Sequence, residues 1–174
     1  MESIEEIHWF VAKTKARQEK KIRQQLTEMG IEVYLPTSVE IRQWHDRKKK
    51  VEMVLIPSTI FIHTNKSKAL SISNGCGVPI RYAIDMMDGK KNLMTVSDKE
   101  MENFIKFLDF SEEPVTTDNT LLFEKGTKVE ITKGVWCGIE GELIRVDNAK
   151  KVVVKLTGLI ACTLEIPMSY LKKK

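Results

Sequence analysis

One segment of the chain decides its fold: Val129-Glu130-Ile131-Thr132-Lys133-Gly134-Val135-Trp136-Cys137-Gly138-Ile139-Glu140-Gly141-Glu142-Leu143-Ile144. Its first residues alternate between apolar and polar, which predicts a strand, and a second strand follows the glycines. Glycine tolerates positive φ and close approach of the backbone, so the spacing of Gly134, Gly138 and Gly141 predicts a tight, shaped loop. We expect these three glycines to be structural and the loop to hold Trp136 between two paired strands.

Strand signals continue from Phe123 to the C-terminus. Short β-branched and apolar runs alternate with the turn sequences Asp147-Asn148-Ala149-Lys150 and Thr157-Gly158. Several short strands within about fifty residues predict a small β-barrel. The glycine loop and its strands resemble the KOW motif, which implies an SH3-like barrel of the kind found in transcription elongation factors and some ribosomal proteins.

The first part of the chain mixes strands with helices. An apolar run at His8–Ala12 predicts a buried strand, and Ile22, Leu26 and Met29 then share one helical face. Gly30 stands where a helix C-terminal cap is expected. Further strands are predicted at 31–35, 60–62 and 79–84, and a short helix at 67–73. The order strand–helix–strand–strand–helix–strand resembles the ferredoxin-like arrangement.

A long hairpin with a basic tip is predicted between Val39 and Leu55, where apolar and polar residues alternate on both sides of a cationic turn. Lysine and arginine neutralise phosphates, and a tryptophan can stack on an unpaired base. The alternative is a solvated hairpin end, where lysines also discourage pairing of strand edges. The candidate nucleic-acid-binding residues are Arg42, Trp44, His45, Arg47, Lys48, Lys49 and Lys50.

A third helix and a linker complete the pattern. Ser97-Asp98-Lys99-Glu100 is a capping box, and Met101, Phe104, Ile105 and Leu108 follow on one face. The polar segment after this helix has no periodicity and contains proline, so it reads as a linker. We therefore predict an α+β chain with a ferredoxin-like domain at 1–110, a linker at 111–122 and a small β-barrel at 123–174.

Taken in order, these features resemble the NusG family over nearly the whole chain. The residues that carry the resemblance are Trp9-Phe10-Val11, Glu19 to Leu26, Val33-Tyr34-Leu35-Pro36, Pro57-Ser58-Thr59-Ile60-Phe61-Ile62, Gly77-Val78, Ser97-Asp98-Lys99-Glu100, Phe123-Glu124-Lys125-Gly126 and the glycine loop. The resemblance implies a transcription elongation or antitermination factor. It implies that an apolar face of the N-terminal domain binds the clamp of RNA polymerase, and that the KOW domain recruits a partner such as ribosomal protein S10 or Rho.

The resemblance suggests where these contacts lie. The candidate polymerase-binding residues are Trp9, Phe10, Thr59, Phe61, Tyr82 and Ile84, and each could instead be ordinary core. Trp136 and Ile139 are the candidate partner-binding residues of the KOW loop. The basic hairpin tip could approach upstream or non-template DNA.

One motif departs from the family pattern. The family usually has Pro-Gly-Tyr before the central strand, and this chain has Pro57-Ser58-Thr59. Thr59 occupies the tyrosine position without its ring, so the polymerase contacts need not use the same atoms. This divergence resembles the specialised RfaH-like or UpxY-like paralogues more than the general elongation factor.

Composition narrows the possible protein classes and the expected cellular location. Hydrophobic residues make up 42 % and charged residues 30 % of the 174-residue chain, the three cysteines are far apart, and no secretory pattern opens the sequence. We expect a cytoplasmic monomer without a membrane span, metal, cofactor or catalytic site. The alternatives are a ribosomal or RNA-binding KOW protein, which the net charge of only +4 disfavours, and a nucleic-acid-modifying enzyme with an SH3-like accessory domain.

Overall fold

The computed structural model describes residues 6–87, 89–109, 116–117, 126–146, 149–156 and 160–174. The chain divides into two compact units, residues 1–97 and 98–174, and each is described by itself. The third helix is grouped with the second unit, whereas the sequence analysis placed it in a first domain ending at residue 110. The boundaries 1–110, 111–122 and 123–174 stay a prediction, and most of the predicted linker lies outside the described residues.

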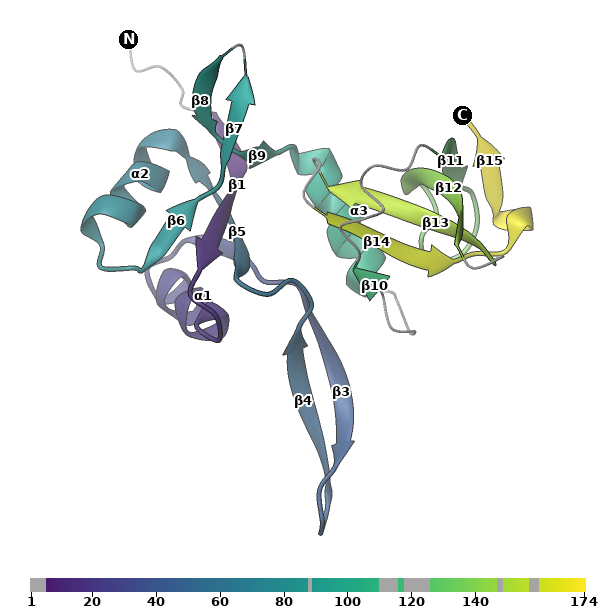
Figure 1. Ribbon diagram of the computed structural model, residues 1–174, viewed down its shortest axis with the longest axis horizontal. Coiled ribbons are helices and arrows are strands. Elements are labelled where there is room, and N and C mark those ends of the chain that lie inside the picture. Colours follow the sequence, from purple (N-terminus) through teal and green to yellow (C-terminus); the bar gives the residue numbers. More distant parts are fainter. Residues whose placement is uncertain (1–5, 88, 110–115, 118–125, 147–148, 157–159) are drawn as a thin grey trace. The chain divides into compact units, whose positions relative to one another are not determined.

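The first unit is built on one antiparallel sheet (Figure 1). Its strand order is β2-β5-β1-β6, and β9 pairs with β1. The elements are β1 (Ile7–Thr14), α1 (Glu19–Glu28), β2 (Glu32–Tyr34), β5 (Thr59–Asn65), α2 (Lys66–Gly75), β6 (Ile80–Tyr82) and β9 (Thr95–Val96). The predicted strand–helix–strand–strand–helix–strand arrangement is confirmed.

Both helices cover the same face of this sheet. Side chains alternate between the two faces of a strand, so Ala12, Ile60 and Ile62 point to one side. They form a buried core with Ile22 of α1 and Ile72 of α2. Residues 9, 11, 59, 61 and 63 therefore lie on the opposite face.

Helix α1 ends at the glycine that the sequence predicts. Gly30 has φ of +72°, a conformation that costs glycine little. The N–H of Gly30 donates to the Thr27 carbonyl at 2.9 Å, and the N–H of Ile31 donates to the Leu26 carbonyl at 3.0 Å. This pair of bonds is a Schellman cap.

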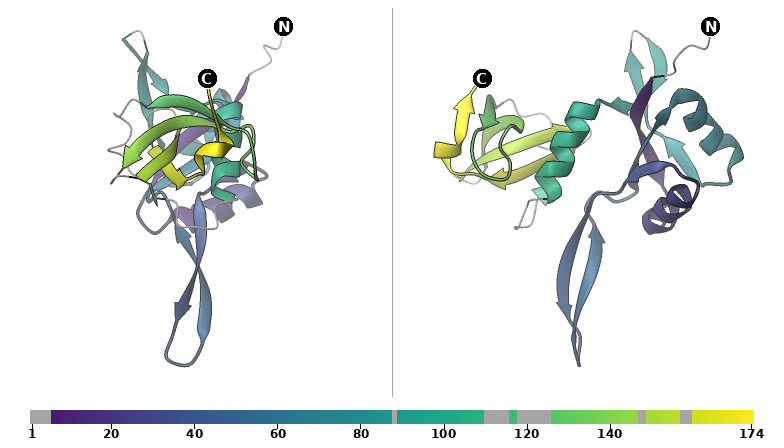
Figure 2. Two further views of the ribbon diagram at one scale, coloured as in Figure 1. Left: turned by 90° about the vertical axis from the view of Figure 1, so that its right-hand side faces the viewer. Right: turned by 180° about the vertical axis from the view of Figure 1, so that it is seen from behind.

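Two hairpins leave the first unit's sheet. The first, β3 (Thr37–Gln43) with β4 (Lys48–Val54), is the predicted basic hairpin, and it projects from the sheet as an arm (Figure 2). The second, β7 (Ile84–Met87) with β8 (Lys90–Leu93), was not predicted. Its signal was the dipeptide Asp88-Gly89, a common hairpin turn, and Gly89 has φ of +73°.

The second unit joins a helix to a six-stranded antiparallel sheet. The strand order is β10-β14-β13-β12-β11-β15, an open path among the described residues. The elements are α3 (Asp98–Asp109), β10 (Thr116–Thr117), β11 (Thr127–Ile131), β12 (Glu140–Val146), β13 (Ala149–Leu156), β14 (Ile160–Glu165), a 3-10 turn (Met168–Tyr170) and β15 (Leu171–Lys173). The predicted small β domain is confirmed, and helix α3 packs near β13 with Met101, Phe104 and Phe107 buried.

Among the described helices, none is long and apolar enough to cross a membrane.

Candidate functional site

The sheet face opposite α1 and α2 carries a row of apolar side chains. Val11 pairs with Phe61, and Phe61 pairs with Tyr34, so these side chains are neighbours across three strands. The Trp9 ring stacks on the His63 ring with centroids 4.6 Å apart. Trp9 is only 7 % exposed and Phe61 is fully buried, so in this structure the row is not an open surface.

Polar contacts fix both ends of this row. At one end, Nδ1 of His63 lies 2.6 Å from Oε2 of Glu32, its cross-strand partner, which orients the ring that Trp9 contacts. At the other end, Nζ of Lys13 donates to the Thr59 hydroxyl at 2.9 Å. Thr59 is 2 % exposed, so the residue at the family's tyrosine position is buried.

The turn before Thr59 is held in an unusual conformation. Ser58 has φ of +57°, a left-handed value that favours glycine. Its N–H donates to Oε1 of the buried Glu19 at 2.8 Å, and its carbonyl accepts from the N–H of Thr14 at 3.0 Å. These two bonds tie the turn to α1 and β1. The left-handed φ of this residue explains why a glycine would suit the position.

The other three predicted polymerase-binding residues lie elsewhere. Phe10 is 2 % exposed on the face that the helices cover, where its ring meets the Tyr82 ring edge-on at 5.9 Å. Burial raises the pKa of Tyr82 to about 12, with the nearby Cys76 as a smaller cause. Ile84 is 56 % exposed at the start of β7. The structure therefore brings Trp9, Thr59 and Phe61 together on one face and separates Phe10, Tyr82 and Ile84 from them.

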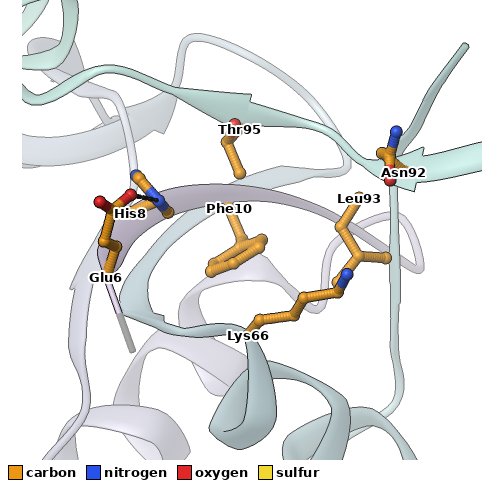
Figure 3. Close-up of a pocket in the computed structure, with 7 residues that line it drawn as sticks. All are labelled: Glu6, His8, Phe10, Lys66, Asn92, Leu93 and Thr95. Carbon is orange, nitrogen blue, oxygen red and sulfur yellow. Dashed lines mark ion pairs between the residues drawn. The ribbon is translucent and has the colours of Figure 1, made fainter. Parts of the chain in front are cut away.

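A hollow of about 450 Å³ opens beside Phe10 (Figure 3). Phe10 and Leu93 supply its apolar lining, and Lys66 reaches across it from the start of α2. Nε2 of His8 lies 3.5 Å from a Glu6 carboxylate oxygen at its edge. The remaining lining residues are Asn92 and Thr95.

The hairpin tip brings all the predicted nucleic-acid-binding residues to one end of the arm. All seven are exposed, and Trp44 is 58 % exposed. The N–H of Trp44 donates to the Arg47 carbonyl at 2.9 Å and closes the turn, while Nζ of Lys49 lies 5.8 Å from the centre of the Trp44 ring. Arg42 is paired with Glu40 at 3.3 Å.

The base of the arm is anchored to α1 by an ion pair that the sequence analysis missed. The Arg23 guanidinium donates to both carboxylate oxygens of Glu52, at 2.8 and 3.2 Å. Nζ of Lys20 lies 3.4 Å from the same carboxylate. These bonds, from Arg23 above all, hold the pKa of Glu52 at about 2. No sequence spacing links residues this far apart.

The glycine loop of the second unit has left-handed backbone at two of its three glycines. Gly134 and Gly138 have φ of +79° and +89°, whereas Gly141 lies in β12 opposite Val129. The N–H of Gly138 donates to the Ile131 carbonyl at 2.7 Å, and the N–H of Ile139 donates to the Trp136 carbonyl at 3.0 Å. The loop is therefore closed onto the end of β11.

The loop's side chains differ in accessibility. Trp136 is half-buried, and Val135 beside it is 57 % exposed. Ile139 is 1 % exposed and packs inside the unit, so it adds no surface to the loop. Tyr170 also belongs to this site, although the sequence pattern did not indicate it. The Tyr170 carbonyl accepts a hydrogen bond from the Thr132 N–H at 2.7 Å. A Cβ added at Gly134 would lie 3.5 Å from the Tyr170 ring.

Comparison with known proteins decides the family. A model of the transcription termination factor NusG matches residues 7–105, more than half of the chain. The chain belongs to the NusG family. Its role is accordingly that of a transcription factor acting on elongation, termination or antitermination.

A solved structure of NusG from Thermotoga maritima is also similar to this NusG-family chain. It is 21 % identical, covers 97 % of each chain and has a TM-score of 0.46. A comparison with curated protein sequences gives no match. Membership of the RfaH-like or UpxY-like paralogues stays a prediction.

Proposed function

We propose that this NusG-family protein is a transcription elongation or antitermination factor that binds RNA polymerase through its first unit. The observation that carries the proposal is the family match over 7–105, which spans almost all of that unit. The proposed contact is the row of Trp9, Thr59 and Phe61, because apolar and aromatic side chains dominate the binding energy of interfaces.

Because this row is buried, the polymerase can bind it only under one physical condition. Trp9 and Phe61 are buried in the structure, so a polymerase that binds them must meet a state in which the face is accessible. A partner that binds only that state shifts the population toward it. The proposed target is the polymerase clamp, and the proposed setting is the cytoplasm, where the family's factors meet the elongating enzyme.

The second unit is proposed to recruit another factor through Val135, Trp136 and Tyr170 on the glycine loop. Ribosomal protein S10 and Rho are the proposed partners. Holding a second factor on the polymerase raises its effective concentration there, so the two binding units together act as a tether. We expect the factor to work as a monomer.

Polymerase binding can be tested with a mild change at the centre of the row. Phe61→Leu keeps an apolar side chain but removes the ring, and we expect it to weaken binding of the full chain to host RNA polymerase about tenfold. Leu70→Ala, on an exposed position of α2, is the matched control and should bind as the wild type does.

Affinity capture with the purified polymerase measures both variants, and thermal unfolding verifies that each is folded. A folded wild-type chain that does not bind the polymerase would remove the proposed mechanism. If the wild type and Phe61→Leu bound the polymerase equally well, the contact would have to lie outside this row.

A further inference from the structure

The outer edge of strand β3 is open. Within the described part of the chain, β3 pairs with β4 alone, so its other edge faces solvent. Such an edge presents backbone N–H and C=O groups on which a further strand can pair. Val39 and Ile41 of the same strand are 66 % and 65 % exposed, and β-branched side chains favour packing between paired strands. Strand β3 therefore offers both backbone groups and apolar side chains to a second strand.

Hydrogen bonds at the two ends of the arm show which residues of β3 face outward. At the tip, the N–H of Trp44 donates to the Arg47 carbonyl at 2.9 Å, and at the base the N–H of Leu55 donates to the Pro36 carbonyl at 2.9 Å. Hydrogen-bonded and non-bonded pairs alternate along an antiparallel ladder. The odd-numbered residues of β3 therefore turn their backbone N–H and C=O groups away from β4.

The outer edge of β4 is protected, unlike that of β3. Lys48 and Lys50 occupy outward positions on β4 by the same alternation, and lysines on a strand edge discourage pairing. Nζ of Lys20 already donates to the outward carbonyl of Glu52. Strand β3 contains no lysine. A further strand would therefore join the arm at β3.

The sequence of β3 is complementary to itself. When Val39-Glu40-Ile41-Arg42-Gln43 runs antiparallel to a second copy with Ile41 opposite Ile41, each Glu40 stands opposite an Arg42. Within one chain Arg42 lies 3.3 Å from Glu40, and both side chains are 53 % exposed, so they remain accessible to a second pair of charges. Ile41 has outward backbone groups, so two copies of it form a hydrogen-bonded pair, whose centre admits a two-fold axis.

We propose that, away from the polymerase, β3 pairs with β3 of a second copy of this chain around a two-fold axis at Ile41. The self-complementary charges favour a second copy over a strand of another protein. Antiparallel pairing also sends the two basic tips to opposite ends, where they do not repel. The contact has five residues a side, against about 20–30 in a stable interface, so we expect a weak dimer with a Kd of about 100 µM. The factor bound to polymerase stays a monomer.

Sedimentation equilibrium of the whole chain over a range of concentrations tests the pairing. The average mass should rise from 20.0 kDa toward twice that value, and should not grow beyond the dimer because the β4 edge is protected. Ile41→Lys places two lysines opposite each other at the axis and should abolish the association. Leu70→Lys, at a 41 % exposed position on α2, is the matched control and should associate as the wild type does.

Exchanging the charges tests the register. Glu40→Arg and Arg42→Glu each set like charges opposite one another, so each variant alone should raise the Kd about tenfold or more. A mixture of the two variants restores both attractive pairs and should form a dimer of one copy of each. The double variant Glu40→Arg/Arg42→Glu should pair with itself as the wild type does. Thermal unfolding verifies that every variant is folded.

Three results would overturn the proposal. The wild-type mass could stay at 20.0 kDa up to about 1 mM, which would leave the β3 edge to a strand of another protein. Ile41→Lys could associate as strongly as the wild type, or the mixed charge variants could stay monomeric where the wild type pairs, and the contact would then lie elsewhere. Because no polymerase takes part, failure here leaves the proposed polymerase contact standing.

Discussion

Ser58 shows how one residue stores strain at a turn that the family builds with glycine. Its left-handed φ of +57° costs a residue with a side chain about 1–2 kcal/mol. The bonds from its backbone to Glu19 and Thr14 hold it there. The sequence shows a serine where the family has glycine, but not that the backbone keeps the left-handed conformation.

Replacing this residue with glycine should therefore stabilise the protein. Ser58→Gly removes the strain but adds freedom to the unfolded chain, which costs about 0.4–1 kcal/mol. We expect the free energy of unfolding in chemical denaturation to rise by up to about 1 kcal/mol. Ser73→Gly, inside α2, is the control and should lower it by about 0.5–1 kcal/mol. If Ser58→Gly lowered the free energy of unfolding as much as Ser73→Gly does, the strain argument would be contradicted.

Glu52 makes stability depend on pH. Its pKa is lowered from 4.5 to about 2 in the folded state, so its stabilisation is complete above about pH 4.5 and is lost as the pH falls toward 2. The carboxylate is 33 % exposed, and solvent screening reduces its contribution to about 1–2 kcal/mol.

Glu52→Gln removes this charge and gives the test. We expect the variant to be about 1–2 kcal/mol less stable than the wild type at pH 7, with the gap closing between pH 4.5 and 2. Denaturant unfolding at a series of pH values measures both proteins. A gap that stays constant with pH would show that the Arg23 ion pair contributes nothing.

At the scale of the elements, strand alternation explains which site predictions could succeed. Trp9 and Phe10 are neighbours on one strand, so they must point to opposite faces, and the sequence pattern alone did not say which face the helices take. Thr59 and Phe61 are two apart and share a face. The β3–β4 arm was predictable because its alternation and basic turn are local. The β7–β8 hairpin also had a local signal, Asp88-Gly89, which was overlooked, whereas the contact of Tyr170 with the glycine loop depends on tertiary structure.

The glycine loop yields a prediction of its own. Trp136→Ala should remove most of the binding to the recruited factor, about tenfold or more in Kd, because aromatic anchors dominate such contacts. Cys137→Ala changes an exposed neighbour in the same loop and should bind normally. Capture of S10 and of Rho by each variant measures the effect. If neither protein binds the wild-type chain, the recruitment proposal fails for both partners.

At the scale of the whole molecule, the proposed binding surfaces belong to different parts of the chain. The first unit combines a sheet face of apolar side chains with an arm whose tip is basic, and the second unit presents a glycine loop that backbone hydrogen bonds close. The order of strands and helices was readable because each local pattern is strong. Burial of Trp9 was foreseeable, because the apolar run His8–Ala12 predicts a buried strand, but the sheet face that the two helices cover was not.

We propose that this NusG-family protein changes transcript elongation by binding the polymerase. The most direct measurement is transcription by the host RNA polymerase on a template that carries a terminator, with and without the purified 174-residue chain. We expect a larger fraction of transcripts to extend past the terminator, and the effect to shrink with Phe61→Leu. A folded protein that leaves both read-through and elongation rate unchanged would contradict the claim.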